Sequence, residues 1–195
     1  ALGRLCRGSD GTPVPLRTVS AGTRTGLVLQ VDDPAQLGAD IVTGAAAAVW
    51  LYGTPVAVLD FGTATVLSCV DANRTLLGVS IAPGMQTSLD GLRGAAALIP
   101  HVELRAPESV LGRNTADSVR AGVVYGTAAM ADGLVERTLR EAHLPPDTPV
   151  VATGGLAGLI LPFCRRRMHR EDALTLYGLY RVFALTARRV ALRKK

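Results

Sequence analysis

The chain has 195 residues, of which 48% are apolar and only 4% aromatic, and its formal net charge is +5. That length allows one large or two small domains with a buried core, and the composition favours a core of Ala, Val and Leu side chains. The three cysteines, Cys6, Cys69 and Cys164, are odd in number and form no CxxC pair. This pattern argues against a disulfide framework or a zinc site and favours a reducing compartment, the cytoplasm.

Two features that suggest a membrane or a nucleic acid have simpler interpretations. The apolar stretch 42–59 is interrupted by Gly44, Gly53 and Pro55, so it is expected to form a helix, a turn and a buried strand, with no membrane segment. Basic residues gather at 165–170 and 188–195 without interleaved aromatic side chains. A solvated basic face is the preferred interpretation, and a nucleic-acid-binding surface is the weaker alternative.

The first half of the chain predicts alternating elements. A loop rich in Gly, Pro and Arg extends to about residue 24, and a strand is predicted at 27–31. A helix over 39–51 comes next. It is followed by three short strands at 56–59, 66–70 and 76–81, joined by tight turns, which predicts an antiparallel meander.

The second half is mainly helical. After the turn 82–84, a helix is predicted with an apolar stripe of Leu89, Leu92, Ala96 and Ile99. The clearest helix begins after Asn114, an N-cap residue with Asp117 in the capping-box position, and extends to about Glu141. A buried strand at 150–152, a turn at Gly154–Gly155 that opens a helix, and a final helix from about 174 complete an α/β domain.

The segment Asp60-Phe61-Gly62-Thr63-Ala64-Thr65 is the most informative one. It places a carboxylate, free backbone N–H groups and two hydroxyls at the end of a buried strand, which suits a phosphate with its counter-cation. The Gly154–Gly155 turn is expected at the same end of the sheet, where ligands of α/β sheets bind. Two such turns favour a nucleotide site, although each also occurs as a structural corner.

Six motifs resemble, in the same order, those of type III pantothenate kinases: Pro34-Ala35-Gln36-Leu37-Gly38-Ala39-Asp40, Asp60-Phe61-Gly62-Thr63-Ala64-Thr65, Ile81-Ala82-Pro83-Gly84, Gly112-Arg113-Asn114-Thr115, Ala152-Thr153-Gly154-Gly155 and Leu174-Thr175-Leu176-Tyr177-Gly178-Leu179. The loop 22–26 is also similar, and the resemblance extends from about residue 15 to 185. It implies the acetate/sugar kinase–Hsc70–actin (ribonuclease H-like) fold and ATP-dependent phosphorylation of pantothenate to 4′-phosphopantothenate, the first step of coenzyme A synthesis. It also implies a homodimer, a monovalent cation (K⁺ or NH₄⁺) and Mg²⁺ with ATP.

The resemblance further implies roles for individual residues. Asp40 matches the general base, Asp60 matches the ligand of the monovalent cation, and the positions that contact substrate are Gly38, Ala39, Ile41 and Thr115. The positions that contact ATP are Gly62, Thr63, Thr65, Gly154 and Gly155. Structural alternatives stay open, because Asp40 and Thr115 could belong to helix caps and Gly154–Gly155 could be a packing turn.

The sequence departs from the family pattern in four places. The Asp-x-Gly-Asn-Thr phosphate loop has no match, the nearest string being Ser9-Asp10-Gly11-Thr12. Ile41 replaces an arginine, Val66 replaces a threonine, and Gly78-Val79-Ser80 stands where paired glycines are usual. These departures keep open a second hypothesis, a non-catalytic dimeric binding or regulatory protein.

The missing phosphate loop also bears on the domain organisation. Residues 1–38 are predicted to be a remnant of the family's first domain, and 39–195 its second domain. The apolar residues near 27–31 are then expected to lack cover. A dimer is predicted, with the long helix after Asn114 as its candidate interface.

Overall fold

The computed structural model describes residues 10–12, 18–20, 22–96 and 98–192, with the side chains of 187–192 excepted. Of the residues considered above, Cys6, Ser9, residues 193–195 and the side chains of Arg188 and Arg189 lie outside this description.

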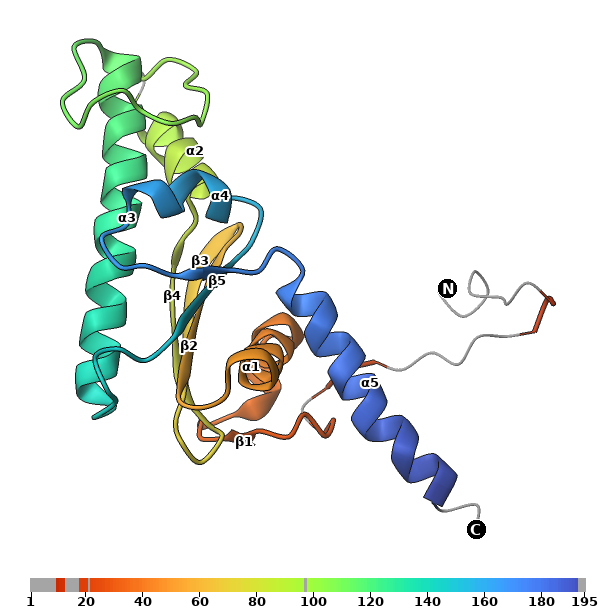
Figure 1. Ribbon diagram of the computed structural model, residues 1–195. Coiled ribbons are helices and arrows are strands. Elements are labelled where there is room, and N and C mark those ends of the chain that lie inside the picture. Colours follow the sequence, from red (N-terminus) through yellow and green to blue (C-terminus); the bar gives the residue numbers. More distant parts are fainter. Residues whose placement is uncertain (1–9, 13–17, 21, 97, 193–195) are drawn as a thin grey trace.

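A six-stranded mixed sheet forms the middle of the fold (Figure 1), with the strand order β1-β4-β3-β2-β5-β6. The strands are β1 (Val28–Leu29), β2 (Val56–Phe61), β3 (Ala64–Val70), β4 (Thr75–Pro83), β5 (Val150–Thr153) and β6 (His169–Arg170). The predicted antiparallel meander is confirmed, since β2 pairs antiparallel with β3 and β3 antiparallel with β4. The other pairings, β1 with β4, β2 with β5 and β5 with β6, are parallel.

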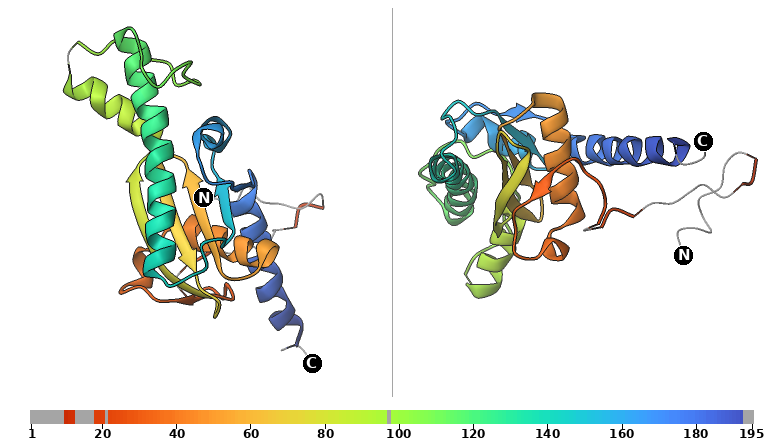
Figure 2. Two further views of the ribbon diagram at one scale, coloured as in Figure 1. Left: turned by 60° about the vertical axis from the view of Figure 1, so that its left-hand side comes forward. Right: turned by 90° about the horizontal axis from the view of Figure 1, so that it is seen from below.

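Helices cover both faces of the sheet, and the expected α/β class is confirmed. Figure 2 shows α1 (Ala39–Tyr52) and α5 (Leu174–Leu192) on one side and α3 (Thr115–Glu141) on the other. The helices α2 (Met85–Ala95) and α4 (Ala157–Ile160) lie with α3, and the short 3-10 turns are η2 (Pro34–Gln36) and η3 (Leu161–Phe163). No helix in the described part of the chain combines the length and the apolar character needed to cross a bilayer.

The side chains of β2 divide between two cores because successive residues of a strand point to opposite faces. Ala57, Leu59 and Phe61 join the core under α3 and α4. Val56 and Val58 join the core under α1 and α5, to which α1 contributes Ala45, Ala47 and Ala48. Asp60 therefore points to the α1 face, although its neighbours on that strand are apolar.

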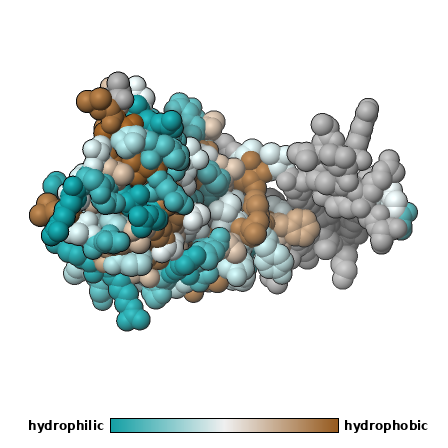
Figure 3. All heavy atoms as spheres, turned by 90° about the horizontal axis from the view of Figure 1, so that it is seen from above, coloured by the Kyte–Doolittle hydropathy of each residue, from teal (hydrophilic) through white to brown (hydrophobic). Residues whose placement is uncertain are grey.

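The predicted strand at 27–31 is only two residues long, and it pairs with Thr75 and Leu76 at the start of β4. The expectation of an uncovered apolar face there is wrong for Leu27 and Leu29, which pack partly buried against the core beneath α1, but Val28 is 60% exposed. Further exposed apolar side chains occur along α5 at Leu176, Leu179, Tyr180 and Phe183. Seen from above, the surface is mostly hydrophilic, with small separate apolar groups (Figure 3). The division of the chain at residue 38 stays a prediction.

Two helices differ from their predicted form. The stripe ending at Ile99 is too long, since α2 ends at Ala95 and Ala96 is its C-cap, but Ile99 still packs with Leu89. The long helix α3 has the predicted bounds, and the Oδ1 of its N-cap Asn114 accepts a hydrogen bond from the backbone N–H of Asp117 at 2.9 Å. The carboxylate of Asp117 accepts a hydrogen bond from the side-chain amide of Asn114, so the capping box closes between the two side chains.

Candidate active site

Two carboxylates meet at the carboxyl end of β2. Asp60 is the penultimate residue of this strand, and Asp40 lies in the first turn of α1. Helix α1 packs against β2 (Figure 1), and its first turn lies near the end of that strand, because both aspartates line the same hollow. Asp40, Ile41 and Asp60 line one hollow of about 20 Å³, together with Gly44, Val58, Val66, Ser68, Thr153 and Thr175. A hollow of this size has room for a water molecule or a single ion.

The electrostatics of this hollow are unbalanced. Burial raises the pKa of Asp60, and the negative charge of Asp40 raises it further. No Lys, Arg or His is among the lining residues. A pair of carboxylates without a cationic partner is stabilised when a counter-ion binds between them, so the donor set fits a cation.

Asp40 does not cap α1. The N-cap is Gly38, and no hydrogen bond of the Asp40 carboxylate exists within the described part of the chain. The carboxylate lies over Gly38, where a Cβ atom would clash with its Oδ1. The first turn of α1 is stabilised instead by Thr43, whose hydroxyl donates a hydrogen bond to the carbonyl of Ala39 at 2.8 Å. The structure thus leaves the Asp40 carboxylate available for chemistry.

The two glycine turns lie side by side, as expected. Asp60 is in register with Thr153 on β5, and the backbone N–H of Leu156 donates to the carbonyl of Phe61 at 3.1 Å. The carbonyl of Thr63 accepts from the N–H of Gly84 at 3.0 Å and from the hydroxyl of Thr87 at 2.7 Å. These contacts leave the Thr63 side chain exposed.

The Gly154–Gly155 turn could serve packing or ligand binding, and the structure gives a different answer for each glycine. Gly154 has φ +93°, and a Cβ there would lie 2.5 Å from Asp60 Oδ1 and 2.6 Å from the Phe61 carbonyl oxygen. Packing therefore accounts for Gly154. Gly155 is exposed and has open space around the position of a Cβ, so packing does not account for it.

Two further predicted residues do not line the hollow. Thr65 alternates with Val66 on β3 and is 1% exposed on the opposite face of the sheet, where its hydroxyl has no hydrogen-bond partner. Thr115 is the exposed first residue of α3, and this end of the helix projects beyond the sheet (Figure 1). Their assignments to ATP and substrate stay predictions.

Three hydroxyl residues line the hollow and were given no role from the sequence, namely Ser68, Thr153 and Thr175. Ser68 lies opposite Val58 on β3, and Thr153 lies opposite Asp60 on β5. Thr153 and Thr175 belong to quoted motifs, and the strand register would have placed Ser68 and Thr153 beside Asp60.

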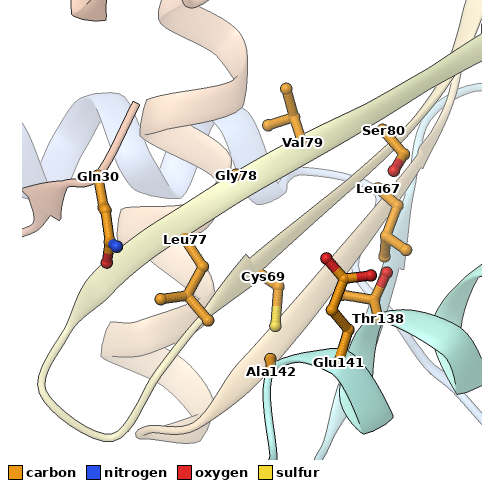
Figure 4. Close-up of a pocket in the computed structure, with 10 residues that line it drawn as sticks. All are labelled: Gln30, Leu67, Cys69, Leu77, Gly78, Val79, Ser80, Thr138, Glu141 and Ala142. Carbon is orange, nitrogen blue, oxygen red and sulfur yellow. The ribbon is translucent and has the colours of Figure 1, made fainter. Parts of the chain in front are cut away.

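A larger cavity of about 340 Å³ lies on the α3 face of the sheet (Figure 4), lined among others by Cys69, Thr138 and Glu141. Burial raises the pKa of the Cys69 thiol to about 11, and the charge of Asp71 adds to this shift. The thiol is therefore protonated and unreactive at neutral pH. This cavity lies away from both carboxylates and both glycine turns.

Comparison with known proteins agrees with this geometry. A family model described as type III pantothenate kinase matches residues 7–137, which include Asp40 and Asp60. The type III pantothenate kinase of Streptomyces avermitilis is 43% identical over 171 residues, and that of Shouchella clausii is 42% identical over 180 residues. These matches cover 87% and 92% of the chain.

The chain belongs to the type III pantothenate kinase family. It spans 64% of the length of the Streptomyces protein and 69% of the Shouchella protein. A solved structure from Campylobacter jejuni, described as a Baf family transcriptional activator, superposes with a TM-score of 0.58 at 16% identity. That match covers 84% of this chain and 71% of the other, and it supports the fold.

We predict opposite outcomes for alanine at the two glycines of the β5–α4 turn. Gly154→Ala should lower the free energy of unfolding by about 2–4 kcal/mol, because a positive φ and a crowded Cβ both oppose it. Gly155→Ala, the matched control, should change it by less than about 0.5 kcal/mol, because its Cβ meets open space. Urea denaturation of both variants measures the difference, and equal midpoints would contradict the packing role of Gly154.

Proposed function

We propose that this chain transfers the γ-phosphoryl group of ATP to the primary hydroxyl of pantothenate and so forms 4′-phosphopantothenate, the first intermediate of coenzyme A synthesis. The observation that carries the proposal is the convergence of Asp40 and Asp60 on one hollow, beside two glycine turns. Family membership supplies the substrate class.

In the proposed reaction, Asp40 is the general base. The pantothenate oxygen attacks the γ-phosphorus, its proton passes to the Asp40 carboxylate, and the bond to ADP breaks. Phosphoryl transfer needs little covalent help, so the main task of Asp40 is to orient the hydroxyl.

The glycine turns are the proposed ATP contacts. Gly62 and the exposed Thr63 hydroxyl form one turn, and Gly155 provides the open surface of the other. Backbone N–H groups at such turns bind phosphate oxygens without side-chain obstruction. Mg²⁺ is proposed to enter bound to the phosphates of ATP.

The monovalent cation is proposed to bind at Asp60. The residues present fit it, because two carboxylates and several hydroxyls line the hollow without any cationic side chain. When bound, K⁺ or NH₄⁺ supplies positive charge near the transferred phosphoryl group.

A non-catalytic binding or regulatory role is the second candidate. The observation that favours it is Ile41, which leaves the hollow without the fixed cation that the family pattern places after Asp40. This role predicts no phosphopantothenate under any condition.

The first test is Asp40→Asn. The wild type should convert pantothenate to 4′-phosphopantothenate with ATP, Mg²⁺ and K⁺, and the variant should lose at least about 100-fold in rate because its amide accepts no proton. Mass spectrometry of the product measures this, with Asp32→Asn, an exposed aspartate outside the hollow, as the matched control. No product from folded wild-type protein would favour the second candidate.

A second test restores the missing charge. Ile41→Arg should bring a guanidinium to the hollow and tighten pantothenate binding by about 10- to 100-fold, the range for a charge-assisted contact to a carboxylate. Isothermal titration calorimetry with pantothenate measures this whether or not the chain is catalytic. Ile41→Met serves as the uncharged control, and equal affinities of the two variants would contradict a substrate-binding role of position 41.

The homodimer is also proposed rather than shown. Its candidate interface is an apolar groove of about 620 Å³ between α2 and α3, lined among others by Leu92, Val119, Val123 and Met130. Sedimentation should find a dimer at micromolar concentration, and Met130→Arg should give a monomer because it places a charge in the groove. Glu136→Arg, on an exposed part of α3, is the control. A monomeric wild type would contradict the proposal.

A further inference from the structure

Three hydroxyl side chains point to the same hollow from three different elements. Ser68 comes from β3, Thr153 from β5 and Thr175 from the start of α5. Ser68 is 3% and Thr153 4% exposed. None of the three hydroxyls has a hydrogen-bond partner among the residues that the structure describes.

Ser68 and Thr153 are buried and Thr175 is half-buried, and the only fully enclosed unpartnered side-chain atom in the described part of the chain is the hydroxyl of Thr65. The three hydroxyl oxygens are therefore open to the hollow, and leaving one unpaired there costs about 1–3 kcal/mol. Two other buried threonines of this chain, Thr43 and Thr148, have bonded hydroxyls. Thr43 donates to the Ala39 carbonyl at 2.8 Å, and Thr148 donates to the Pro145 carbonyl at 2.7 Å. The three hydroxyls around the hollow have no such hydrogen-bond partner. A partner for them would lie in the hollow that they share.

The chemistry of the hollow limits what that partner is. Two carboxylates and three neutral oxygens surround a space of about 20 Å³, and the remaining lining is apolar. A small cation satisfies both the charge of the carboxylates and the lone pairs of the hydroxyls. Two carboxylates with neutral oxygens suit one monovalent ion better than Mg²⁺, which requires an octahedral shell that it usually completes with several waters.

The position of Thr175 is held firmly. One turn further along α5, Gly178 lies directly on the carbonyl of Thr43, where a Cβ would clash. On the same side, Leu174 is fully buried in the core beneath α1, and its Cδ2 would lie 3.9 Å from a Cβ at Gly44. This packing fixes α5 against α1, so Thr175 is preorganised opposite the two carboxylates.

We propose that Ser68, Thr153 and Thr175 are neutral oxygen ligands that complete the monovalent-cation site at Asp60. The proposal rests on the proposed function in one respect, the assignment of Asp60 to K⁺ or NH₄⁺. It adds that strands β3 and β5 and helix α5 each contribute one ligand.

The test is the stabilisation of the protein by K⁺. Thermal unfolding is followed during a KCl titration at constant ionic strength, with tetramethylammonium chloride as the balancing salt because its cation is too large for the hollow. The wild type should be stabilised by K⁺ and by NH₄⁺. Ser68→Ala, Thr153→Val and Thr175→Val should each raise the apparent Kd for K⁺ by about tenfold.

Two controls make the result specific. Thr65→Val removes a buried unpartnered hydroxyl from the other face of the sheet, so it should leave the K⁺ response unchanged. Thr153→Ser keeps the oxygen and should restore most of the K⁺ affinity that Thr153→Val loses. If Thr153→Val fails to fold, Ser68→Ala and Thr175→Val decide the outcome.

The outcomes separate this proposal from the proposed function. If Asp60→Asn abolishes the K⁺ response while the three hydroxyl variants keep wild-type affinity, the ligand assignment is wrong and the cation at Asp60 stands. A wild type with no K⁺ response overturns the ligand assignment. If the hydroxyl variants weaken K⁺ binding but no phosphopantothenate forms, the ligand assignment is supported and the kinase activity is not.

Discussion

The parallel pairing of β2 with β5 is the contact on which the candidate site depends. It sets Asp60 opposite Thr153 and brings the turn after each strand to the same end of the sheet. Gly154 then passes so close to Asp60 and Phe61 that no side chain fits between them. This pairing joins segments about 90 residues apart, and without it neither the carboxylate nor the turns would form one site.

A second contact, between α1 and α5, builds the other wall of the hollow. Gly178 and Thr43 allow the two helices to touch backbone to backbone, which positions Asp40 and Thr175 from opposite directions. Small residues predominate on α1, where Ala45, Ala47 and Ala48 are fully buried. The low aromatic content noted in the sequence therefore has a structural reason on this face, since bulky side chains would separate the helices from each other and from the sheet.

Much of this fold follows from patterns within single segments. The spacing of apolar residues predicted α1 and α3 with nearly correct bounds, and the short strands between tight turns predicted the meander. The Asp60 turn stood out because an acid at the end of an apolar strand breaks the pattern around it. Family motifs pointed to Asp40, whose local sequence alone allowed a helix cap.

The features that the sequence did not predict depend on contacts between distant segments of the chain. The cover over Leu27 and Leu29 comes from the core beneath α1, which no local pattern around residue 27 reveals. The sequence did not indicate that Ser68 and Thr175 line the hollow. Hydroxyl residues are common in strands and at helix starts, and only the packing of the elements shows what they face. The face that Thr65 occupies is also set by the register, since one step along β3 moves a side chain to the other face of the sheet.

The only tryptophan of the chain, Trp50, lies on α1 where this helix contacts α5. Trp50 is 43% exposed, its ring lies 5.6 Å from the guanidinium carbon of Arg181, and its centroid is 6.4 Å from that of Tyr180. The molecule thus contains a single tryptophan fluorophore, at the contact between the two helices that supply Asp40 and Thr175. Its emission reports on one place alone, and any change in how α5 rests on α1 becomes visible without a label.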